Sequence, residues 1–197
     1  MSDVPISIDT RHAAVAKAAV EAGADIVNDV SVRTFDPDML STVAQLGVPI
    51  ILMHMRGTPE TMESKTVYDD VVEDVVKALI DRSNDAEKAG IPRWMQVVDP
   101  GIGFAKDIQG NLLLLKNTST IRSKLGGLPM LLGTSRKGFI GKLTGETIAE
   151  ERDFGTLSSC VAALCLGNGP VGCNVLRVHS VKAAKQASQV MDAIRNV

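Results

Sequence analysis

Residues 133–141 hold the groups of this chain that are best suited to bind negative charge. Ser135, Arg136 and Lys137 follow one another there, directly after the short apolar run 129–132, which predicts a buried strand. Gly138 then opens a segment whose free backbone N–H groups and helix dipole would face the same space. The pattern predicts an anion-binding loop, and the alternative is a solvated turn with a chance pair of cations.

Three more polar side chains stand where apolar runs end, and together they suit a flat ring that is rich in nitrogen. They are Asp9, Asn28 and Asp99. A carboxylate that is partly removed from water needs hydrogen-bond donors, which ring N–H and amino groups would supply. Asn28 adds a donor and an acceptor, and Lys137 suits a ring carbonyl. The alternative for each acid is that it caps the helix that follows it.

Arg177 and His179 lie at the end of the apolar run 174–178 and are two residues apart. Residues with this spacing face the same side of a strand. A guanidinium beside an imidazole suits a phosphate group. For Arg177, the alternative is a buried ion pair.

The elements that must position these groups alternate regularly along the chain. Strands are expected at 4–8, 24–27, 48–53, 95–98, 129–132 and 174–178. Helices are expected at 13–22, 36–47, 68–89, 111–125, 150–167 and 181–196, the second of them starting with Asp36 as its cap and Pro37 as its first residue. Such alternation predicts an α/β fold with a parallel sheet.

Polar groups after every predicted strand favour a barrel over an open sheet, in which only the strands beside one crevice carry ligand groups. We therefore predict a (β/α)8 TIM-barrel type fold, with residues 1–197 as a single domain. Six βα units are recognisable, whereas a barrel has eight. The sequence thus predicts a barrel that is incomplete at its N-terminus and contains strands 3–8.

The composition predicts a globular protein of 197 residues with 45% hydrophobic residues and a formal net charge of −2. This charge gives no reason to expect nucleic acid or an anionic membrane as a partner. The first residues lack the basic and apolar regions of a secretory signal, so we expect a cytoplasmic protein. Cys160, Cys165 and Cys173 are odd in number and lack metal-site spacing, which predicts buried thiols.

Six segments, at residues 8–10, 26–31, 52–57, 99–104, 134–137 and 176–180, resemble in order and spacing the dihydropteroate synthase family of pterin-binding enzymes. The resemblance covers nearly the whole chain. It implies the TIM barrel and a transferase of folate biosynthesis. This enzyme joins 6-hydroxymethyl-7,8-dihydropterin diphosphate to p-aminobenzoate, releasing diphosphate, with Mg²⁺ assisting.

By position, the resemblance assigns each group to a subsite. The pterin would be held by Asp9, Asn28, Asp99 and Lys137, between the apolar walls Met53 and Phe104 and against Arg177. The diphosphate would meet Asn28, Arg177 and His179, and the p-aminobenzoate carboxylate would meet Ser135, Arg136 and Gly138. The catalytic groups would be Lys137, Arg177 and His179. No metal ligand is expected in this chain, because the family's Asn for Mg²⁺ belongs to a segment before Met1.

The chain departs from the family pattern at two positions and leaves alternatives open. Gly138 stands where many members have Ser, and Ser180 stands where Asp is usual.

Two alternatives to the synthase remain open. One alternative is a pterin-binding fragment without activity, since we expect the 197 residues alone to be unstable or inactive. The other is a corrinoid-linked methyltetrahydrofolate methyltransferase domain, which the 135–137 loop argues against.

The resemblance also leaves the assembly and location open. A homodimer is one expectation, because the family commonly forms dimers through helices near its carboxyl end. A fusion to hydroxymethyldihydropterin pyrophosphokinase in a longer protein is another. A mitochondrial location would follow if a preceding segment carried a transit peptide.

Overall fold

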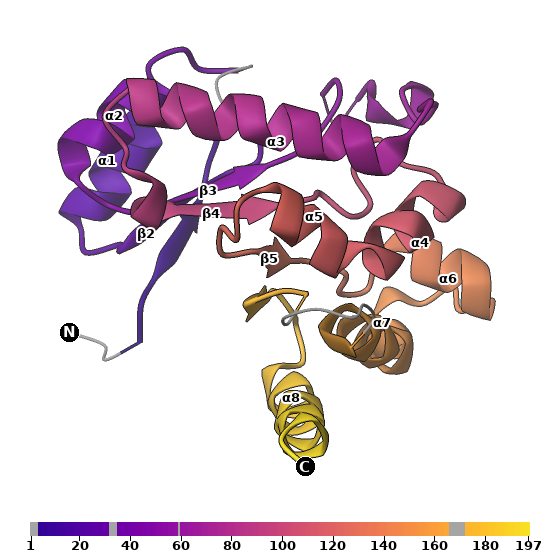
Figure 1. The fold of residues 1–197 in the computed structure, drawn as a ribbon. Coiled ribbons are helices and arrows are strands. Elements are labelled where there is room, and N and C mark those ends of the chain that lie inside the picture. Colours follow the sequence, from indigo (N-terminus) through magenta and orange to yellow (C-terminus); the bar gives the residue numbers. More distant parts are fainter. Residues whose placement is uncertain (1–3, 32–34, 59, 166–171) are drawn as a thin grey trace.

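A computed structural model describes residues 4–31, 35–58, 60–165 and 172–197, in which parallel strands alternate with helices (Figure 1). The strands are β1 (Ser7–Asp9), β2 (Ile26–Asp29), β3 (Ile50–Met53), β4 (Gln96–Asp99), β5 (Leu131–Leu132) and β6 (Val175–Leu176). The α-helices are α1 (Ala13–Glu21), α2 (Met39–Leu46), α3 (Val71–Lys88), α4 (Ile108–Lys116), α5 (Thr118–Lys124), α6 (Gly138–Thr144), α7 (Asp153–Cys165) and α8 (Val181–Arg195). Short 3-10 helices are η1 (Met62–Ser64), η2 (Arg93–Met95) and η3 (Ala149–Arg152).

The strands pair in the order in which they occur along the chain. β1 to β4 form one parallel sheet, and β5 and β6 form a second parallel pair. A parallel bridge between Val98 and Met130 joins the two. Within the described residues, the bridge therefore places all six strands side by side, with β1 and β6 at the two outer edges.

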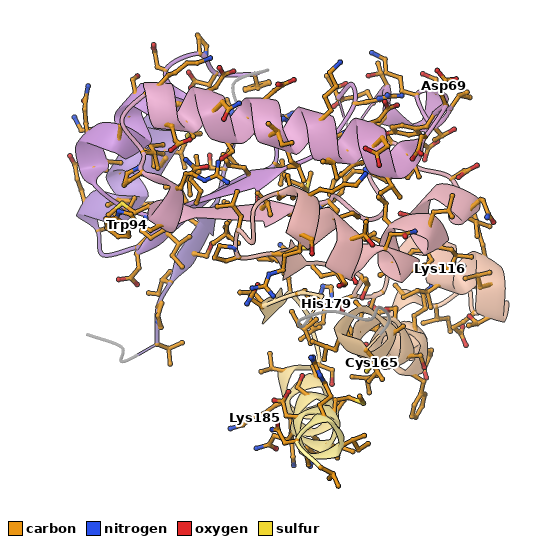
Figure 2. All side chains as sticks on the ribbon, viewed as in Figure 1. Asp69, Trp94, Lys116, Cys165, His179 and Lys185 are labelled. Carbon is orange, nitrogen blue, oxygen red and sulfur yellow. The ribbon has the colours of Figure 1, made fainter. Side chains whose placement is uncertain are left out.

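The pairing register places the carboxyl ends of the strands along one edge. Asp9 is the partner of Asn28 in the β1–β2 pair, and Met53 is the partner of Asp99 in the β3–β4 pair. Figure 2 shows the exposed Trp94, just before β4, at the other end of that strand from Asp69, which precedes α3. In parallel α/β folds, ligands bind at the carboxyl edge.

Two apolar clusters fix the helices to the strands. In one of them α3, which lies along β3 and β4 in Figure 1, buries Val75 and Leu79 completely. In the other, α2 packs Met39 and Val43 against the β2–β3 region. Each fully buried side chain of this kind contributes about 1.5–3 kcal/mol. The strand ends are therefore carried by a rigid support.

The segment 111–125 does not form the single helix that its apolar spacing predicts. Helix α4 ends at Lys116 and α5 begins at Thr118, with Asn117 between them at φ −108° and ψ 17°. The Asn117 amide donates to the Leu113 carbonyl at 2.8 Å, and the Thr118 hydroxyl donates to the Ala163 carbonyl at 3.1 Å. Such side-chain bonds compete with the helix backbone, which explains the break.

Helix α2 begins later than expected, with Asp38 as its N-cap. The Asp36 carboxylate instead accepts hydrogen bonds from the backbone N–H of Asp38 at 3.0 Å and of Ala13 at 2.7 Å. It thereby joins the turn before α2 to the start of α1, and Pro37 lies outside the helix. The expected helix 150–167 also starts late, at Asp153 after η3, and its last two residues lie outside the described part of the chain.

The three cysteines are free thiols, and two of them, Cys160 and Cys173, are buried as expected. The expectation of burial is wrong for Cys165, which is exposed at the end of α7 with its Sγ 3.6 Å from Met191 Sδ on α8. None of the helices in the described ranges is long and apolar enough to cross a membrane.

Candidate functional site

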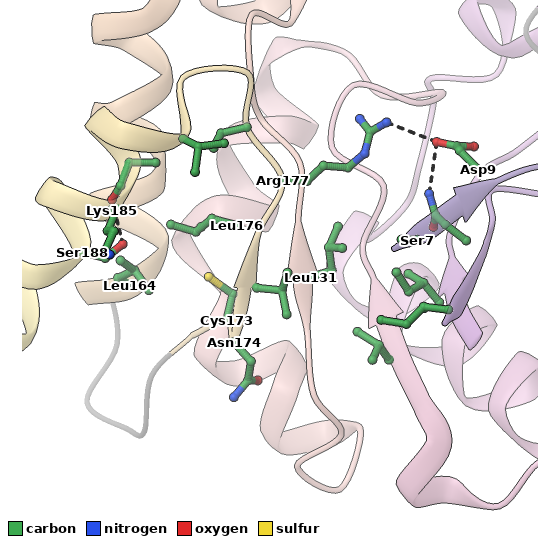
Figure 3. Close-up of a pocket in the computed structure, with 18 of the residues that line it drawn as sticks. Ser7, Asp9, Leu131, Leu164, Cys173, Asn174, Leu176, Arg177, Lys185 and Ser188 are labelled. Atoms are coloured by element: carbon green, nitrogen blue, oxygen red, sulfur yellow. Dashed lines mark hydrogen bonds and ion pairs between the residues drawn. The ribbon is translucent and has the colours of Figure 1, made fainter. Parts of the chain in front are cut away.

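The ends of β1, β2 and β6 meet in a hydrogen-bonded group of Asp9, Asn28 and Arg177, which we call the Asp9 cluster (Figure 3). Oδ2 of Asp9 accepts from Nη2 of Arg177 and from Nδ2 of Asn28, each at 3.2 Å. Asn28 is buried, whereas the side chains of Asp9 and Arg177 are 48% and 59% exposed. An ion pair this exposed contributes at most about 1 kcal/mol. A ligand can therefore separate it at little cost.

A cavity of about 770 Å³ lies between the strands and α8, and the Asp9 cluster stands at its edge (Figure 3). Most of its wall is apolar and comes from inward-facing strand residues, among them Ile26, Ile51, Val97, Leu131 and Leu176. Asp99 and Lys137 do not line it. The cavity therefore lies on the inner face of the strands. The polar side chains of the Asp9 cluster lie at the carboxyl ends of these strands.

Asp99 and Lys137 form a second group with Phe104, which we call the Asp99 cluster. Asp99 is 7% exposed, and its Oδ1 accepts the backbone N–H of Gly101 at 2.7 Å. The Lys137 ammonium donates to the carbonyl of Ile102 and lies 4.3 Å from the centroid of the Phe104 ring. Burial raises the pKa of Asp99, and the Lys137 charge opposes that rise. Burial lowers the pKa of Lys137 to about 8, and the Asp99 charge opposes that fall.

Arg177 connects the two clusters electrostatically. Its backbone N–H donates to the Leu132 carbonyl of β5 at 2.9 Å, and its positive charge lowers the pKa of Asp99 and also that of Lys137. The acids and cations that follow β1, β4, β5 and β6 therefore act within one field. Two carboxylates and two cations at one edge can bind a ligand that has donors on one side and an anion on the other.

Two glycines allow the loop after β4 to approach its neighbours. Gly101 has φ +68°, and a Cβ there would lie 1.9 Å from the His54 carbonyl oxygen. Gly103 has φ +80°, and a Cβ there would lie 2.6 Å from Cδ of Lys137. Met53, the buried last residue of β3, lies against Gly101. The loop thus closes onto both β3 and Lys137 because these positions lack side chains.

Ser135 and His179 are joined at the ends of β5 and β6. The Ser135 Oγ accepts the backbone N–H of His179 at 3.1 Å and lies 2.8 Å from Nδ1 of the same ring. A hydroxyl can both donate and accept, so the direction of the hydrogen bond between Oγ and Nδ1 depends on the tautomer of the ring. A group expected to bind p-aminobenzoate and one expected to bind diphosphate are therefore in direct contact.

The structure does not bring Arg136 into the two clusters. Its Nε and Nη2 donate to the two carboxylate oxygens of Asp153, at 2.8 and 3.1 Å, and its carbonyl accepts from Arg152 at 3.0 Å. This bidentate pair fixes the loop to the start of α7. Gly138 is exposed and begins α6, which has only seven residues.

Sequence reasoning missed Lys106, a buried cation behind the loop after β4. Its side chain donates to the carbonyls of Gly101 and Phe104, both at 2.9 Å, and lies 3.0 Å from His54 Nδ1. The available signal was a lysine two residues after Phe104. Its burial depends on packing against β3, which sequence spacing does not reveal.

The residues that the structure describes contain no group of three or more His, Cys, Asp or Glu side chains that could hold a metal ion. The expected Mg²⁺ ligand was an Asn outside this chain. The donor set of the two clusters, two carboxylates paired with cations, does not fit a Mg²⁺ site, because Mg²⁺ requires a near-octahedral set of oxygens.

Comparison with known families decides the assignment. A family model described as "Pterin binding enzyme" matches residues 1–179. This chain belongs to the pterin-binding enzyme family. The matched span contains every residue of the Asp9 and Asp99 clusters, as well as Ser135 and His179.

Individual members of the pterin-binding enzyme family match over 98% of this chain. They include a folic acid synthesis protein of Pneumocystis carinii at 45% identity, a mitochondrial folate synthesis bifunctional protein of Arabidopsis thaliana at 43%, and a dihydropteroate synthase of Synechocystis at 41%. The chain spans 26%, 36% and 64% of their respective lengths. It therefore corresponds to only part of these relatives.

Solved structures of dihydropteroate synthases share the fold. The Yersinia pestis enzyme with a sulfonamide drug complex is 33% identical, with a TM-score of 0.92 over 99% of this chain and 68% of that one. The Thermus thermophilus enzyme in complex with 6HMPPP is 37% identical, with a TM-score of 0.88 over 98% and 73%. The Xanthomonas albilineans enzyme with 4-aminobenzoic acid is 39% identical, with a TM-score of 0.88 over 100% and 67%. The α/β fold of this chain thus matches that of dihydropteroate synthases.

Proposed function

We propose that this chain acts as a dihydropteroate synthase, which joins 6-hydroxymethyl-7,8-dihydropterin diphosphate to p-aminobenzoate and releases diphosphate. One observation carries the proposal: the Arg177 guanidinium pairs with Asp9, while its backbone N–H donates to the Leu132 carbonyl, so the ends of β1, β5 and β6 lie together. The Thermus and Xanthomonas relatives, which hold 6HMPPP and 4-aminobenzoic acid, support this choice of substrates.

We further propose that the six strands are the third to eighth strands of a TIM barrel, within the single domain 1–197. The edges of β1 and β6 are unpaired in the described residues, and the exposed Asp9–Arg177 pair bridges them. Two more parallel strands would satisfy both edges. We expect catalytic turnover to need these strands, whereas pterin binding rests on groups already present.

The pterin ring would lie across the Asp99 cluster. The Asp99 carboxylate would accept from ring N–H and amino groups, and Lys137 would donate to the ring carbonyl. Asn28, held by its bond to Asp9, would add a donor and an acceptor to the same ring. Phe104, which already faces the Lys137 ammonium, would form an apolar wall, with Met53 behind it.

The diphosphate would lie on Arg177 and His179. When the pterin enters, Asp9 accepts from the ring and releases Arg177, whose guanidinium can then bind the phosphate oxygens and lie against the ring. The bond between the pterin methylene and the diphosphate oxygen breaks, and the electron pair leaves with the diphosphate. Arg177, His179 and Lys137 would stabilise the charge that develops there. The aryl amine would attack the methylene, forming the C–N bond, and would lose one proton to the released diphosphate or to water.

The p-aminobenzoate carboxylate would meet Ser135 and the backbone N–H of Gly138. Ser135 is already oriented by its two contacts with His179. We assign Arg136 a supporting role, because its guanidinium is occupied by both carboxylate oxygens of Asp153. The loop would thus present Ser135 and Lys137 to the site while Arg136 holds it from outside.

Mg²⁺ would supply charge to the leaving diphosphate in the family reaction. Since the described residues do not fit a site for it, none of the proposed steps uses the metal.

The proposed assembly and cellular location are taken from the relatives. We propose a homodimer or a fusion to the pyrophosphokinase, in the cytoplasm or in mitochondria, as the Arabidopsis name suggests.

Calorimetric titration with the pterin diphosphate tests the proposal. The variant Lys137→Met should lower the affinity by about 10- to 100-fold, because a charge-assisted hydrogen bond contributes about 1.5–3 kcal/mol. Asp99→Asn should lower it similarly. The matched controls are Lys142→Met and Asp69→Asn, two exposed residues of the same types, which should leave the affinity unchanged.

Adding p-aminobenzoate and measuring the formation of dihydropteroate distinguishes the two functional alternatives. Formation of dihydropteroate supports the synthase, and pterin binding without it supports the non-catalytic fragment. Unchanged pterin affinity in both Lys137→Met and Asp99→Asn would eliminate the pterin assignment itself.

A further inference from the structure

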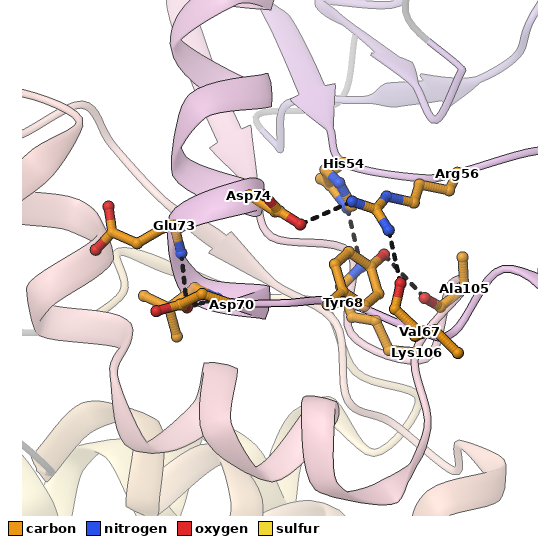
Figure 4. A network of polar contacts seen from close by, with 10 residues as sticks. His54, Arg56, Val67, Tyr68, Asp70, Glu73, Asp74, Ala105 and Lys106 are labelled. Carbon is orange, nitrogen blue, oxygen red and sulfur yellow. Dashed lines mark hydrogen bonds and ion pairs between the residues drawn. The ribbon is translucent and has the colours of Figure 1, made fainter.

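Lys106 is a buried cation that the proposed reaction does not use. It is 8% exposed, and its ammonium has three partners: the carbonyls of Gly101 and Phe104 and Nδ1 of His54. Figure 4 shows the contact between Lys106 and His54. An ammonium has three donors, so all of them are engaged. Burial lowers the pKa of Lys106 to about 7, and the nearby Asp99 charge opposes that fall. A buried cation is costly unless hydrogen bonds replace its lost water, and these three partners do so.

His54 serves Lys106 as a neutral acceptor. The ring is 2% exposed, and burial, followed by the charges of Lys106, Arg82 and Arg56, lowers its pKa to about 2. Because Nδ1 faces an ammonium, the ring proton lies on Nε2. His54 directly follows β3, so Lys106 joins the end of β3 to the loop after β4.

That loop has an unfavourable backbone that needs external support. Gly101, Gly103 and the non-glycine residue Ala105 all have positive φ, with Ala105 at +51°. A left-handed non-glycine residue costs about 1–2 kcal/mol. The Tyr68 hydroxyl donates to the Ala105 carbonyl at 2.9 Å, and Lys106 donates to the carbonyls of Gly101 and Phe104 in the same loop. The loop is therefore held from outside rather than by its own conformation.

We propose that Lys106 is a positioning residue for pterin binding: it clamps the loop after β4 onto His54 and keeps the Asp99 carboxylate ionised. The second role follows from geometry: Lys106 donates to the Gly101 carbonyl at 2.9 Å, and the backbone N–H of Gly101 donates to Oδ1 of Asp99 at 2.7 Å. The ammonium is thus held near the carboxylate, and its charge opposes the effect of burial on the pKa of Asp99. The assignment to pterin binding rests on the proposed function, whereas the effect on Asp99 does not need a ligand.

The electrostatic environment of this pair contains several other charges. The titratable or charged groups that act on Lys106 or Asp99, besides each other, are His54, Arg56, Arg82, Lys137 and Arg177. Replacing Lys106 leaves all of them in place. A change in the ionisation of Asp99 in such a variant would therefore report the loss of the Lys106 charge.

The test compares Lys106→Met, and Lys106→Gln as a neutral variant that can still donate, with Tyr68→Phe. Tyr68→Phe removes one hydrogen bond to the same loop without changing any charge. For each folded variant, carboxyl NMR of the ligand-free protein gives the pKa of Asp99, and titration gives the affinity for the pterin diphosphate across pH. A folding control is the thermal melting curve.

We expect both Lys106 variants to raise the pKa of Asp99 by about 0.5 or more, because a neighbouring cation favours the carboxylate. The pH below which pterin binding weakens should rise by the same amount, and below that pH the affinity of Lys106→Met should fall by about threefold or more, the factor that corresponds to about 0.5 pKa unit. Tyr68→Phe should leave the pKa of Asp99 unchanged.

An unchanged Asp99 pKa in the folded Lys106 variants, or an equal shift in Tyr68→Phe, would overturn the proposal. If neither Lys106 variant folds, Lys106 is a structural residue and the proposal is likewise overturned. If the unaltered protein binds no pterin, the proposed function and the assignment of Lys106 to pterin binding fail together, while the Asp99 titration still decides the electrostatic role.

Discussion

Gly103 offers the sharpest test of the link between the loop after β4 and Lys137. A Cβ at Gly103 would lie 2.6 Å from Cδ of Lys137, whereas real contacts of this kind stay beyond 3.0 Å. The variant Gly103→Ala must therefore displace the Lys137 side chain by at least 0.4 Å, the difference between these two distances. The displacement would move the ammonium away from Asp99 and from the proposed pterin carbonyl.

The expected effect of Gly103→Ala has two separable parts, a loss of stability and a loss of pterin affinity. At φ +80°, an alanine costs about 1–2 kcal/mol of stability through the backbone. Gly47→Ala is the matched control, because Gly47 has φ +66° and a Cβ there would meet nothing within 4 Å. Both variants should lose similar stability. Only Gly103→Ala should also weaken a charge-assisted hydrogen bond of about 1.5–3 kcal/mol, which corresponds to roughly 10- to 100-fold in pterin affinity.

The assay combines chemical denaturation with calorimetric titration of the pterin diphosphate for both variants. We expect comparable decreases in the free energy of unfolding and a large affinity loss in Gly103→Ala alone. Equal pterin affinity in Gly103→Ala and Gly47→Ala would refute the reasoning, because it would mean that the position of Lys137 does not matter for the ligand.

Three further outcomes are expected. Asp9→Asn should weaken pterin binding about tenfold, yet change the melting temperature little because its pair with Arg177 is exposed; a large loss of stability would contradict this. Pterin affinity should fall as the pH rises through about 8, since Lys137, whose pKa burial lowers, then loses its proton; the fall should be absent in Lys137→Met. Ser135→Ala should weaken p-aminobenzoate binding in a calorimetric titration and leave pterin affinity unchanged, because Ser135 contacts only His179 among the groups assigned to diphosphate; an equal loss for both substrates would argue against separate subsites.

The same Lys137 shift affects stability with a definite sign. Its folded pKa, about 8, lies below the ordinary 10.5, so the unfolded chain binds more protons between these values. The contribution of Lys137 to stability therefore increases as the pH rises through this window. Function and stability are thus expected to change in opposite directions with pH.

The position of the site could be predicted because parallel strands share one carboxyl edge. Asp9 and Asp99 end their strands and Asn28 is the last but one residue of β2, and the observed register aligns them, with Asp9 paired to Asn28 and Asp99 paired to Met53. The two-residue alternation of side chains along a strand and the parallel direction of the strands were enough to predict that these residues lie at one edge. Arg177 lies beyond the last strand, and it was expected at the same edge.

Directions of side chains could not be predicted in the same way. Arg136 adopts a left-handed backbone with φ +59°, which turns its guanidinium toward Asp153, 17 residues later. The break at Asn117 depends on side-chain bonds that include a partner on α7. Lys106 is defined by carbonyl oxygens and by His54, 52 residues earlier. Each of these features depends on contacts between distant segments, which residue spacing does not encode.

The central claim is that the strand ends form one cleft, with acids for a pterin ring and cations for its diphosphate. A crystal structure of the protein with bound pterin diphosphate tests it most directly. We predict ring donors on the carboxylates of Asp9 and Asp99, the ring carbonyl on Lys137, and the phosphates on Arg177 and His179. A pterin ring bound elsewhere, for example within the apolar cavity beside α8, would contradict the account.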